Sequence, residues 1–210
     1  MRVISGSCRG RKLSPFNHDQ IRPTSDKVRE AIFSILPHTK KKAKKILDLF
    51  AGTGALGIEA LSRATPDYKD RELDLEPRHE EQAKQNKQEN LLCVFIEESK
   101  KAADIIRKNI QTCSFEENSW IITKTVEKAL PVLSTKKVQF ELVFIDAPYK
   151  DLAPTTCAME DLIRLNLLAK GATLVVEIPS KGEALPSIEG LLLEKEKKYG
   201  DTKVCFFRFD

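Results

Sequence analysis

The sequence has little that would support a metal site, a disulfide framework or a membrane span. Its five cysteines, at positions 8, 93, 113, 157 and 205, are scattered and odd in number, and its three histidines lie far apart. No apolar run approaches the roughly 18 residues of a membrane span, and the N-terminus lacks the apolar core of a secretion signal. We therefore expect free thiols, no metal, no membrane contact and a cytoplasmic location.

What the chain does have is an ordinary globular composition with an uneven distribution of charge. Of its 210 residues, 41% are hydrophobic and 31% are charged, which suits one domain. Residues 1–45 contain 12 Lys and Arg against 3 acids, although the net charge of the whole chain is only +4. Two basic runs, 9–12 and 40–45, indicate contact with a polyanion. A solvated surface is the commoner explanation of a charge run taken alone.

Apolar, strand-like segments alternate with helical ones along most of the chain. The predicted strands are 45–51, 91–98, 119–125, 140–146 and 172–178. The predicted helices are 22–36, capped by Thr24 or Ser25, one that opens after the glycines at 52–57, 99–110, a short one that ends near 133, and 155–167. The tail predicts a hairpin around Gly200 and Asp201. Such alternation is typical of a parallel sheet with helices on both faces, which binds ligands beyond the carboxyl ends of its strands.

Residues 66–90 interrupt this alternation. They include 13 charged residues out of 25 and almost no large apolar ones. Such a stretch cannot bury enough surface to fold alone, so we interpret it as a solvated insertion. A specific interaction surface is the alternative.

A glycine-rich turn follows the first predicted strand. Gly52, Gly54 and Gly57 stand between that strand and a helix, where the backbone can turn tightly and a ligand can approach free N–H groups. The next strand ends at Glu97, which could accept hydrogen bonds from both hydroxyls of a ribose. Dinucleotide enzymes share this pattern, so it indicates a nucleoside cofactor without deciding which.

The fourth predicted strand ends in Asp146-Ala147-Pro148-Tyr149. Acids and prolines commonly end strands, so a plain turn is one interpretation. A hydride-transferring enzyme would need a proton donor or acceptor on the substrate side, and we find no convincing set of such residues. The acid at a strand end instead favours a second functional group beside the nucleoside site.

Together, DLFAGTGALGIEAL and DAPY resemble the first and fourth motifs of class I S-adenosylmethionine methyltransferases, the fourth being similar to the motif of enzymes that methylate nucleobase amines. The stretches GSCRGRKL, RPTSDKVREAIFSIL, LDLFAGTGALGIEALSR, VFIEESKKAADIIRKN and YGDTKVCFFR resemble the RsmD family. The resemblance covers nearly the whole chain except the insertion. It implies methylation of the N2 amine of a guanine in 16S ribosomal RNA, guanine 966, with S-adenosylmethionine as cofactor.

The resemblance also implies an architecture and partners. We expect a Rossmann-like α/β fold with a mostly parallel seven-stranded sheet, helices on both faces and a C-terminal antiparallel hairpin. Residues 1–40 would form a basic N-terminal extension with a capped helix, and 41–210 the methyltransferase domain with its insertion. The partner would be 16S ribosomal RNA or an assembling small-subunit particle, bound by a monomer.

Carried onto this sequence, the family pattern assigns three groups of residues. The catalytic group is Asp146, Ala147, Pro148 and Tyr149. The cofactor group is Arg22, Thr24, Asp48, Ala51, Gly52, Gly54, Gly57, Glu97, Thr125 and Asp146. The RNA-binding group is Arg9, Arg11 and Lys12, with Arg22 able to serve either ligand.

Two positions depart from the family pattern. Ala147 stands where the family usually has proline, and Thr125 stands where it usually has an acid that meets the adenine amine. Two alternatives therefore stay open. One is methylation of adenine N6 or another nucleobase amine, and the other is an inactive methyltransferase-like module that binds RNA.

Overall fold

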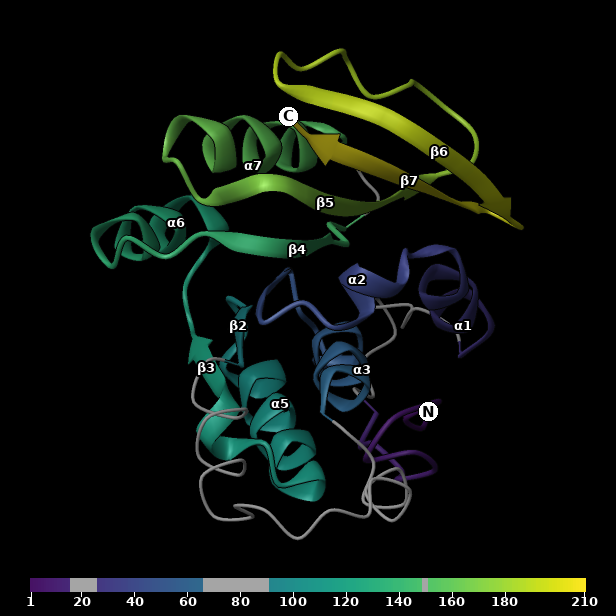
Figure 1. The fold of residues 1–210 in the computed structure, drawn as a ribbon, viewed down its shortest axis with the longest axis vertical. Coiled ribbons are helices and arrows are strands. Elements are labelled where there is room, and N and C mark those ends of the chain that lie inside the picture. The colour runs from purple at the N-terminus through teal and green to yellow at the C-terminus, as the bar shows by residue number, and fades with distance from the viewer. Residues whose placement is uncertain (16–25, 66–90, 149–150) are drawn as a thin grey trace, which may run out of the picture.

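A seven-stranded sheet organises the chain (Figure 1). The structure is a computed structural model that describes residues 1–15, 26–65, 91–148 and 151–210. The strands are β1 (Lys45–Leu49), β2 (Leu92–Ile96), β3 (Ser119–Ile122), β4 (Phe140–Ile145), β5 (Leu168–Pro179), β6 (Leu191–Tyr199) and β7 (Thr202–Phe209). Their order in the sheet is β3-β2-β1-β4-β5-β7-β6. The first five strands are parallel, and β7 pairs antiparallel with both β5 and β6.

Helices cover both faces of this sheet. The helices on one face are α1 (Asp26–Ile35), α3 (Ala55–Ala64) and α5 (Lys100–Cys113), and those on the other are α6 (Val126–Thr135) and α7 (Ala153–Arg164). Two short elements lie in the connections: α2 (His38–Lys41) between α1 and β1, and the 3₁₀ helix η2 (Glu116–Asn118) between α5 and β3. Because both faces are covered, the central strands are apolar without alternation, which is why they were recognisable in the sequence.

The predicted fold class is confirmed. Each predicted strand coincides with an observed one, and the C-terminal hairpin turns at Gly200 and Asp201 as expected. The strand predicted at 172–178 is longer, because β5 begins at Leu168 and carries an irregularity in its pairing with β4. The predicted cap of the first helix and the insertion at 66–90 lie outside the described residues.

The sequence analysis missed how residues 1–15, the N-terminal segment, are ordered. Arg2 and Lys12 form an isolated antiparallel bridge, and the Val3 amide donates to the carbonyl of Arg11 at 3.0 Å. Val3, Cys8 and Leu13 are buried in the same core as α1, α3 and α5. Figure 1 shows this segment beside α3, at the other end of the molecule from the β6–β7 hairpin.

The topology creates one position suited to a ligand. Strand β1 has β2 on one side and β4 on the other, so the connections that leave β1 and β4 run in opposite directions across the sheet. Parallel sheets of this kind bind ligands at the carboxyl ends of the strands beside that reversal. Within the described residues, every helix is too short or too polar to cross a lipid bilayer.

Candidate active site

The backbone turns sharply after β1. Phe50 has a φ of 57°, Gly52 of 57° and Gly54 of 73°, all in the left-handed region. Gly54 is the N-cap of α3, and its amide donates to the carbonyl of Ala51 at 2.7 Å. Positive φ at a bulky residue such as Phe50 is unusual and concentrates at functional turns. The sequence pattern gave no sign of it.

Two glycines of this turn, Gly52 and Gly57, have different surroundings. A Cβ added to Gly52 would meet only the carbonyl oxygen of Phe50, at 3.9 Å, so the space above this residue is open. A Cβ on Gly57 would lie 2.4 Å from the ring of Phe95 and 2.7 Å from the sulfur of Cys93. Gly52 therefore leaves room for a ligand, whereas Gly57 allows α3 to pack directly against β2.

Glu97, at the end of β2, is fixed by the same turn. Its Oε2 accepts from the Gly52 amide at 2.8 Å, and its Oε1 accepts from the Ser99 amide at 2.8 Å. Burial raises the pKa of the Glu97 carboxyl, and these two amide donors oppose the rise. The carboxylate is thus held in place, with lone pairs left to accept from further donors.

Asp48 links β1 to α3 from inside the protein. It is 2% exposed, and its Oδ2 accepts from the Gly57 amide at 2.9 Å. Burial raises its pKa well above the ordinary value, and the neighbouring charges of Asp146 and Glu97 raise it further. The structure therefore brings three of the predicted residues, from three adjacent strands, to one edge of the sheet.

Asp146 and Ala147 directly follow β4. Asp146 is half-buried, Ala147 is buried and Pro148 is exposed, while Tyr149 lies outside the described residues. The register pairs Ile145 with Val176, so Glu177 of β5 comes level with Asp146 across the two strands. Glu177 is 3% exposed. Sequence reasoning missed it because it stands inside an apolar run, and only the strand pairing sets it beside Asp146.

Thr125 stands where β3 leads into α6. It is the N-cap of α6, yet its side chain makes no capping hydrogen bond. The Glu97 amide donates to the carbonyl of Ile122, at the end of β3, at 3.2 Å, so this loop adjoins the Glu97 end of β2. The hydroxyl of Thr125 is therefore not committed to the helix cap.

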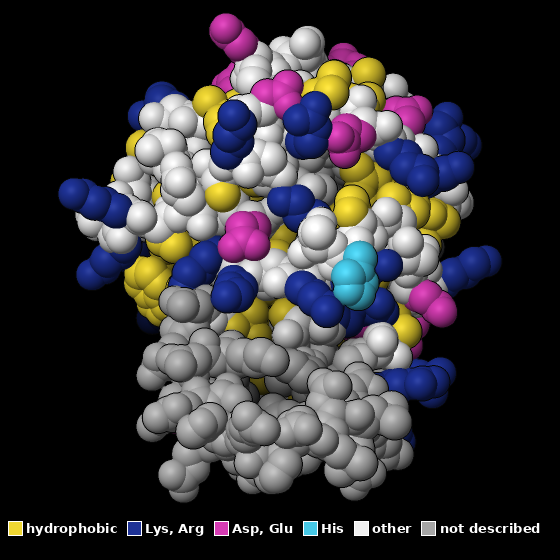
Figure 2. Space-filling view, viewed as in Figure 1, with side chains coloured by type: hydrophobic (Ala, Val, Ile, Leu, Met, Phe, Trp, Pro, Cys, Tyr) yellow, Lys and Arg dark blue, Asp and Glu magenta, His cyan; other side chains and the backbone are white. Residues whose placement is uncertain are grey.

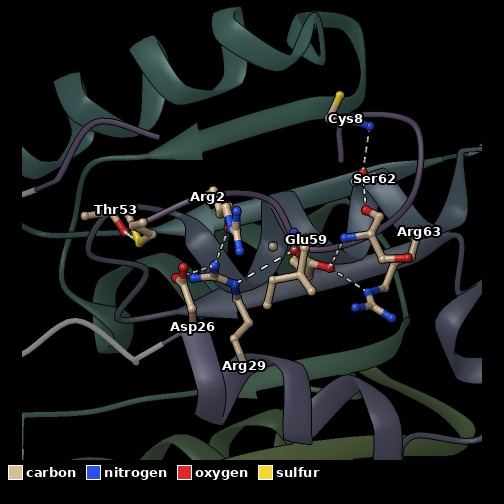
Figure 3. Close-up of polar contacts among 12 residues, drawn as sticks. Arg2, Cys8, Asp26, Arg29, Thr53, Glu59, Ser62 and Arg63 are labelled. Carbon is tan, nitrogen blue, oxygen red and sulfur yellow. Dashed lines mark hydrogen bonds and ion pairs between the residues drawn. The ribbon is translucent and has the colours of Figure 1, made fainter. Parts of the chain in front are cut away.

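A polar cluster with a buried centre attaches the N-terminal segment to α3, the helix that follows the glycine turn. This Glu59 cluster consists of Asp26, Arg29, Glu59, Ser62 and Arg63 (Figure 3). Glu59 accepts from the amides of Ile4 at 2.7 Å and Ser5 at 3.1 Å. Arg63 pairs with it at 2.7 Å and Arg29 at 3.8 Å, from opposite sides in Figure 3. Glu59 and Arg29 are 0% exposed, so water does not screen these two charges, whereas Asp26 is exposed.

Asn109 of α5 joins the N-terminal segment to the glycine turn. Its Nδ2 donates to the carbonyl of Thr53 at 2.9 Å and to that of Ser14 at 3.2 Å. Its Oδ1 accepts from the Ser14 amide at 2.7 Å. Asn109 is fully buried, so these bonds tie three elements together at the base of the turn.

The predicted RNA-binding residues lie on the surface of the segment. Arg9, Arg11 and Lys12 are exposed, and the Arg11 guanidinium donates to the carbonyl of Thr112 at the end of α5. The predicted residues Arg22 and Thr24 lie outside the described residues. None of the five cysteines forms a disulfide, and the described residues contain no group of three His, Cys, Asp or Glu side chains that could hold a metal.

The sequence matches one family over most of its length. The family described as Conserved hypothetical protein 95 matches residues 1–90 and 87–208. The chain belongs to this family. The Ribosomal RNA small subunit methyltransferase D of Haemophilus influenzae is 34% identical, over 95% of this chain and 89% of its own length. YlbH of Bacillus subtilis, named as a candidate rRNA methyltransferase, is 30% identical over 99% of this chain and 98% of its own length. The predicted RsmD-type family is confirmed.

Solved structures agree on the fold. The Escherichia coli protein yhhF, described as a candidate methyltransferase, matches with a TM-score of 0.74 and 27% identity, over 100% of this chain and 98% of its own. An O-methyltransferase from Bacillus cereus, solved in complex with SAH, matches with a TM-score of 0.60 at 16% identity, over 93% of this chain and 84% of its own. The fold is that of the class I methyltransferases. Relatives and neighbours named as methyltransferases support S-adenosylmethionine as the cofactor.

Proposed function

We propose that this protein methylates the exocyclic N2 amine of a guanine in 16S ribosomal RNA, guanine 966 by family resemblance, with S-adenosylmethionine as methyl donor. The observation that carries the proposal is the convergence of the glycine turn, Glu97 and Asp146 at the carboxyl edge of the sheet. The ribosomal RNA methyltransferase named above supports the choice of RNA.

The described residues fit such a cofactor. The open space at Gly52 admits a ligand against the backbone, and the Glu97 carboxylate beside it suits the two hydroxyls of a ribose. Ala51 and Gly54 complete the turn, and the Thr125 hydroxyl is available to the adenine end. Asp48 and Gly57 support the site without contacting the cofactor. The hydrogen bond from the Gly57 amide to the Asp48 carboxyl holds α3 against the glycine turn.

When bound, S-adenosylmethionine supplies a methyl group on a positively charged sulfur, with a neutral thioether as leaving group. The amine of guanine is a weak nucleophile because its lone pair is delocalised into the ring. Hydrogen-bond acceptors on its two N–H groups favour the tetrahedral nitrogen and the positive charge that develops there. The Asp146 carboxylate provides one acceptor and the carbonyl of Ala147 the second.

Ala147 keeps this role without the usual proline. The acceptor is a backbone carbonyl, which does not depend on the side chain. Ala147 precedes Pro148 and is therefore biased towards an extended conformation, and its own side chain is 5% exposed. Both constraints restrict the direction of the carbonyl. Tyr149 would stack on the base, as an aromatic side chain does with an extruded nucleotide.

The basic residues of the N-terminal segment supply the RNA contacts. Arg9, Arg11 and Lys12 are exposed and belong to a segment that the Glu59 cluster holds on α3. Phosphate contacts of this kind set the position of the RNA without reading its sequence. The substrate would be 16S ribosomal RNA or a particle that contains it.

The test separates chemistry from cofactor binding. Asp146→Ala should lower methyl transfer to 16S ribosomal RNA at least about 100-fold, the range of a lost transition-state acceptor, while S-adenosylmethionine affinity changes little. Asp161→Ala, which removes a half-buried carboxylate on α7 that pairs with Arg164, is the control. Transfer is measured with labelled methyl donor and binding by calorimetry. Near-wild-type transfer by Asp146→Ala would contradict the proposal.

The base and position are tested in cells. Mass spectrometric mapping of 16S ribosomal RNA from cells that lack this protein should show the loss of one N2-methylguanine. Retention of every methylguanine refutes the proposed base. Loss of a methyladenine instead would favour the adenine-N6 alternative.

A further inference from the structure

We infer that the RNA-contacting surface continues from the N-terminal segment onto one stripe of α5, where Lys108 and Lys101 extend it towards the candidate active site. The inference rests on the proposed function, since it names the surface that would hold the same RNA. Neither lysine stood among the residues that the sequence pattern assigned to RNA.

The N-terminal segment lies along α5 in a defined direction. The Cys8 thiol donates to the carbonyl of Cys113 at 3.3 Å, and Arg11 donates to that of Thr112. The Ser14 amide then meets the side chain of Asn109 at 2.7 Å. Partner numbers fall as segment numbers rise, so the segment runs antiparallel to α5, towards the first turn of that helix.

Lys101 and Lys108 share one stripe of α5 with Thr112, whose carbonyl accepts from Arg11. They precede Thr112 by eleven and four residues, and spacings of seven and four residues keep side chains on one stripe of a helix. The carbonyl of Thr112 holds Arg11, so the stripe starts where the basic segment touches the helix. Both lysines are exposed.

The stripe leads to the candidate cofactor site. The helix begins after Ser99, whose side chain caps it and whose amide bonds Glu97 at 2.8 Å. From Lys108 to Lys101 the helix covers about 10 Å towards that end. Its one acid, Asp104, pairs with Arg107 at 2.5 Å. The exposed surface of α5 therefore has a net positive charge, and the exposed Glu98 lies just before the helix begins.

The chemistry of this surface fits a sugar-phosphate backbone. Lysines on flexible stems, spaced along a helix, act as point charges for phosphates and read no base edge. Such contacts release counterions, so their number appears in the salt dependence of binding. An RNA strand held on Arg11, Lys108 and Lys101 would follow α5 to the methylation site.

The double variant K101Q/K108Q tests the inference. With a 16S ribosomal RNA transcript as probe, its affinity should fall about tenfold at physiological salt. The slope of log affinity against log salt should decrease by about 1.4 to 1.8, the effect of two lost phosphate contacts. S-adenosylmethionine affinity and thermal unfolding should match the wild type.

The control K195Q/K197Q removes two exposed lysines of β6, the strand at the opposite edge of the sheet from β3. Its salt slope should equal that of the wild type. An unchanged slope in K101Q/K108Q, or an equal decrease in the control, overturns the inference. The proposed function is tested separately with the wild-type protein. It fails if that protein transfers no methyl group to 16S ribosomal RNA.

Discussion

The two ends of β1 carry charge in opposite ways. The carboxyl end leads to Asp48, Glu97 and Asp146, which are wholly or partly buried and, for the first two, fixed by backbone amides. The amino end carries the lysine run at 40–45, in which Lys42 and Lys44 are exposed and the other lysines are half-buried. Figure 2 shows Lys and Arg side chains gathered over α2, in this run. The two ends are about 16 Å apart, the length of a five-residue strand.

The comparison shows that local charge density says little about role. Lys40, half-buried, has its pKa lowered by burial, while the charges of Glu141 and Glu194 oppose the change. The run thus lies against acids of β4 and β6. At the other end, burial raises the pKa of Asp48, and the neighbouring charges of Asp146 and Glu97 add to the rise. Groups kept together at such a cost in free energy mark the functional end.

The largest effect should come from adding a side chain at Gly57, where α3 packs against β2 without room for one. Gly57→Val would place new atoms within 3 Å of Phe95 and Cys93. We expect a loss of about 3 kcal/mol or more in the free energy of unfolding, measured with urea, because the core there cannot expand. Ala153→Val, at an exposed helical position, should change it by less than about 0.5 kcal/mol. A stable Gly57→Val protein would show that α3 does not pack on β2 as described.

A smaller effect should follow from removing the ribose acceptor. Glu97→Gln should weaken S-adenosylmethionine binding about 10- to 100-fold, since a charged acceptor contributes about 1.5 to 3 kcal/mol. Glu98→Gln, which changes the exposed neighbour, should bind normally. Calorimetric titration of both variants checks this. Equal affinities would remove Glu97 from the cofactor site.

The pH dependence of stability should reveal the buried carboxyl. The folded pKa of Asp48 lies well above its ordinary value of 3.8, so the folded state holds this proton more tightly than the unfolded chain does. Its contribution to stability is full below that value and is lost as pH rises through the folded pKa. Asp48→Asn should flatten this fall, seen as unfolding free energies between acidic and neutral pH. Parallel curves for the two proteins would contradict the assignment.

The smallest effect belongs to the amino end of β1. K42Q/K44Q should change the unfolding free energy by less than about 0.5 kcal/mol, as exposed substitutions usually do. Cofactor affinity should be unchanged. Urea unfolding measures the stability and calorimetry measures the cofactor affinity. A tenfold loss of cofactor affinity would show that the amino end of β1 also contributes to the cofactor site.

Much of this arrangement could be predicted from local pattern. Apolar runs marked the parallel strands because both faces of the sheet are covered, and two candidate acids, Glu97 and Asp146, stand at the end of such a run. Other features depend on tertiary packing. The sequence alone would predict that Arg29, a charged residue, lies on the surface, yet it is buried against Glu59. The sequence does not distinguish Gly52, which faces open space, from Gly57, which faces Phe95.

Asn109 has a consequence for the order in which the chain can fold. Residues 1–15 are synthesised before their partners, because their bonds to Glu59, Ser62 and Asn109 join them to residues 54 to 95 positions later in the chain. The bonds to Asn109 can form only after α5 has been synthesised. The same side chain donates to the carbonyl of Thr53, so the docking of α5 fixes the N-terminal segment and the glycine turn together.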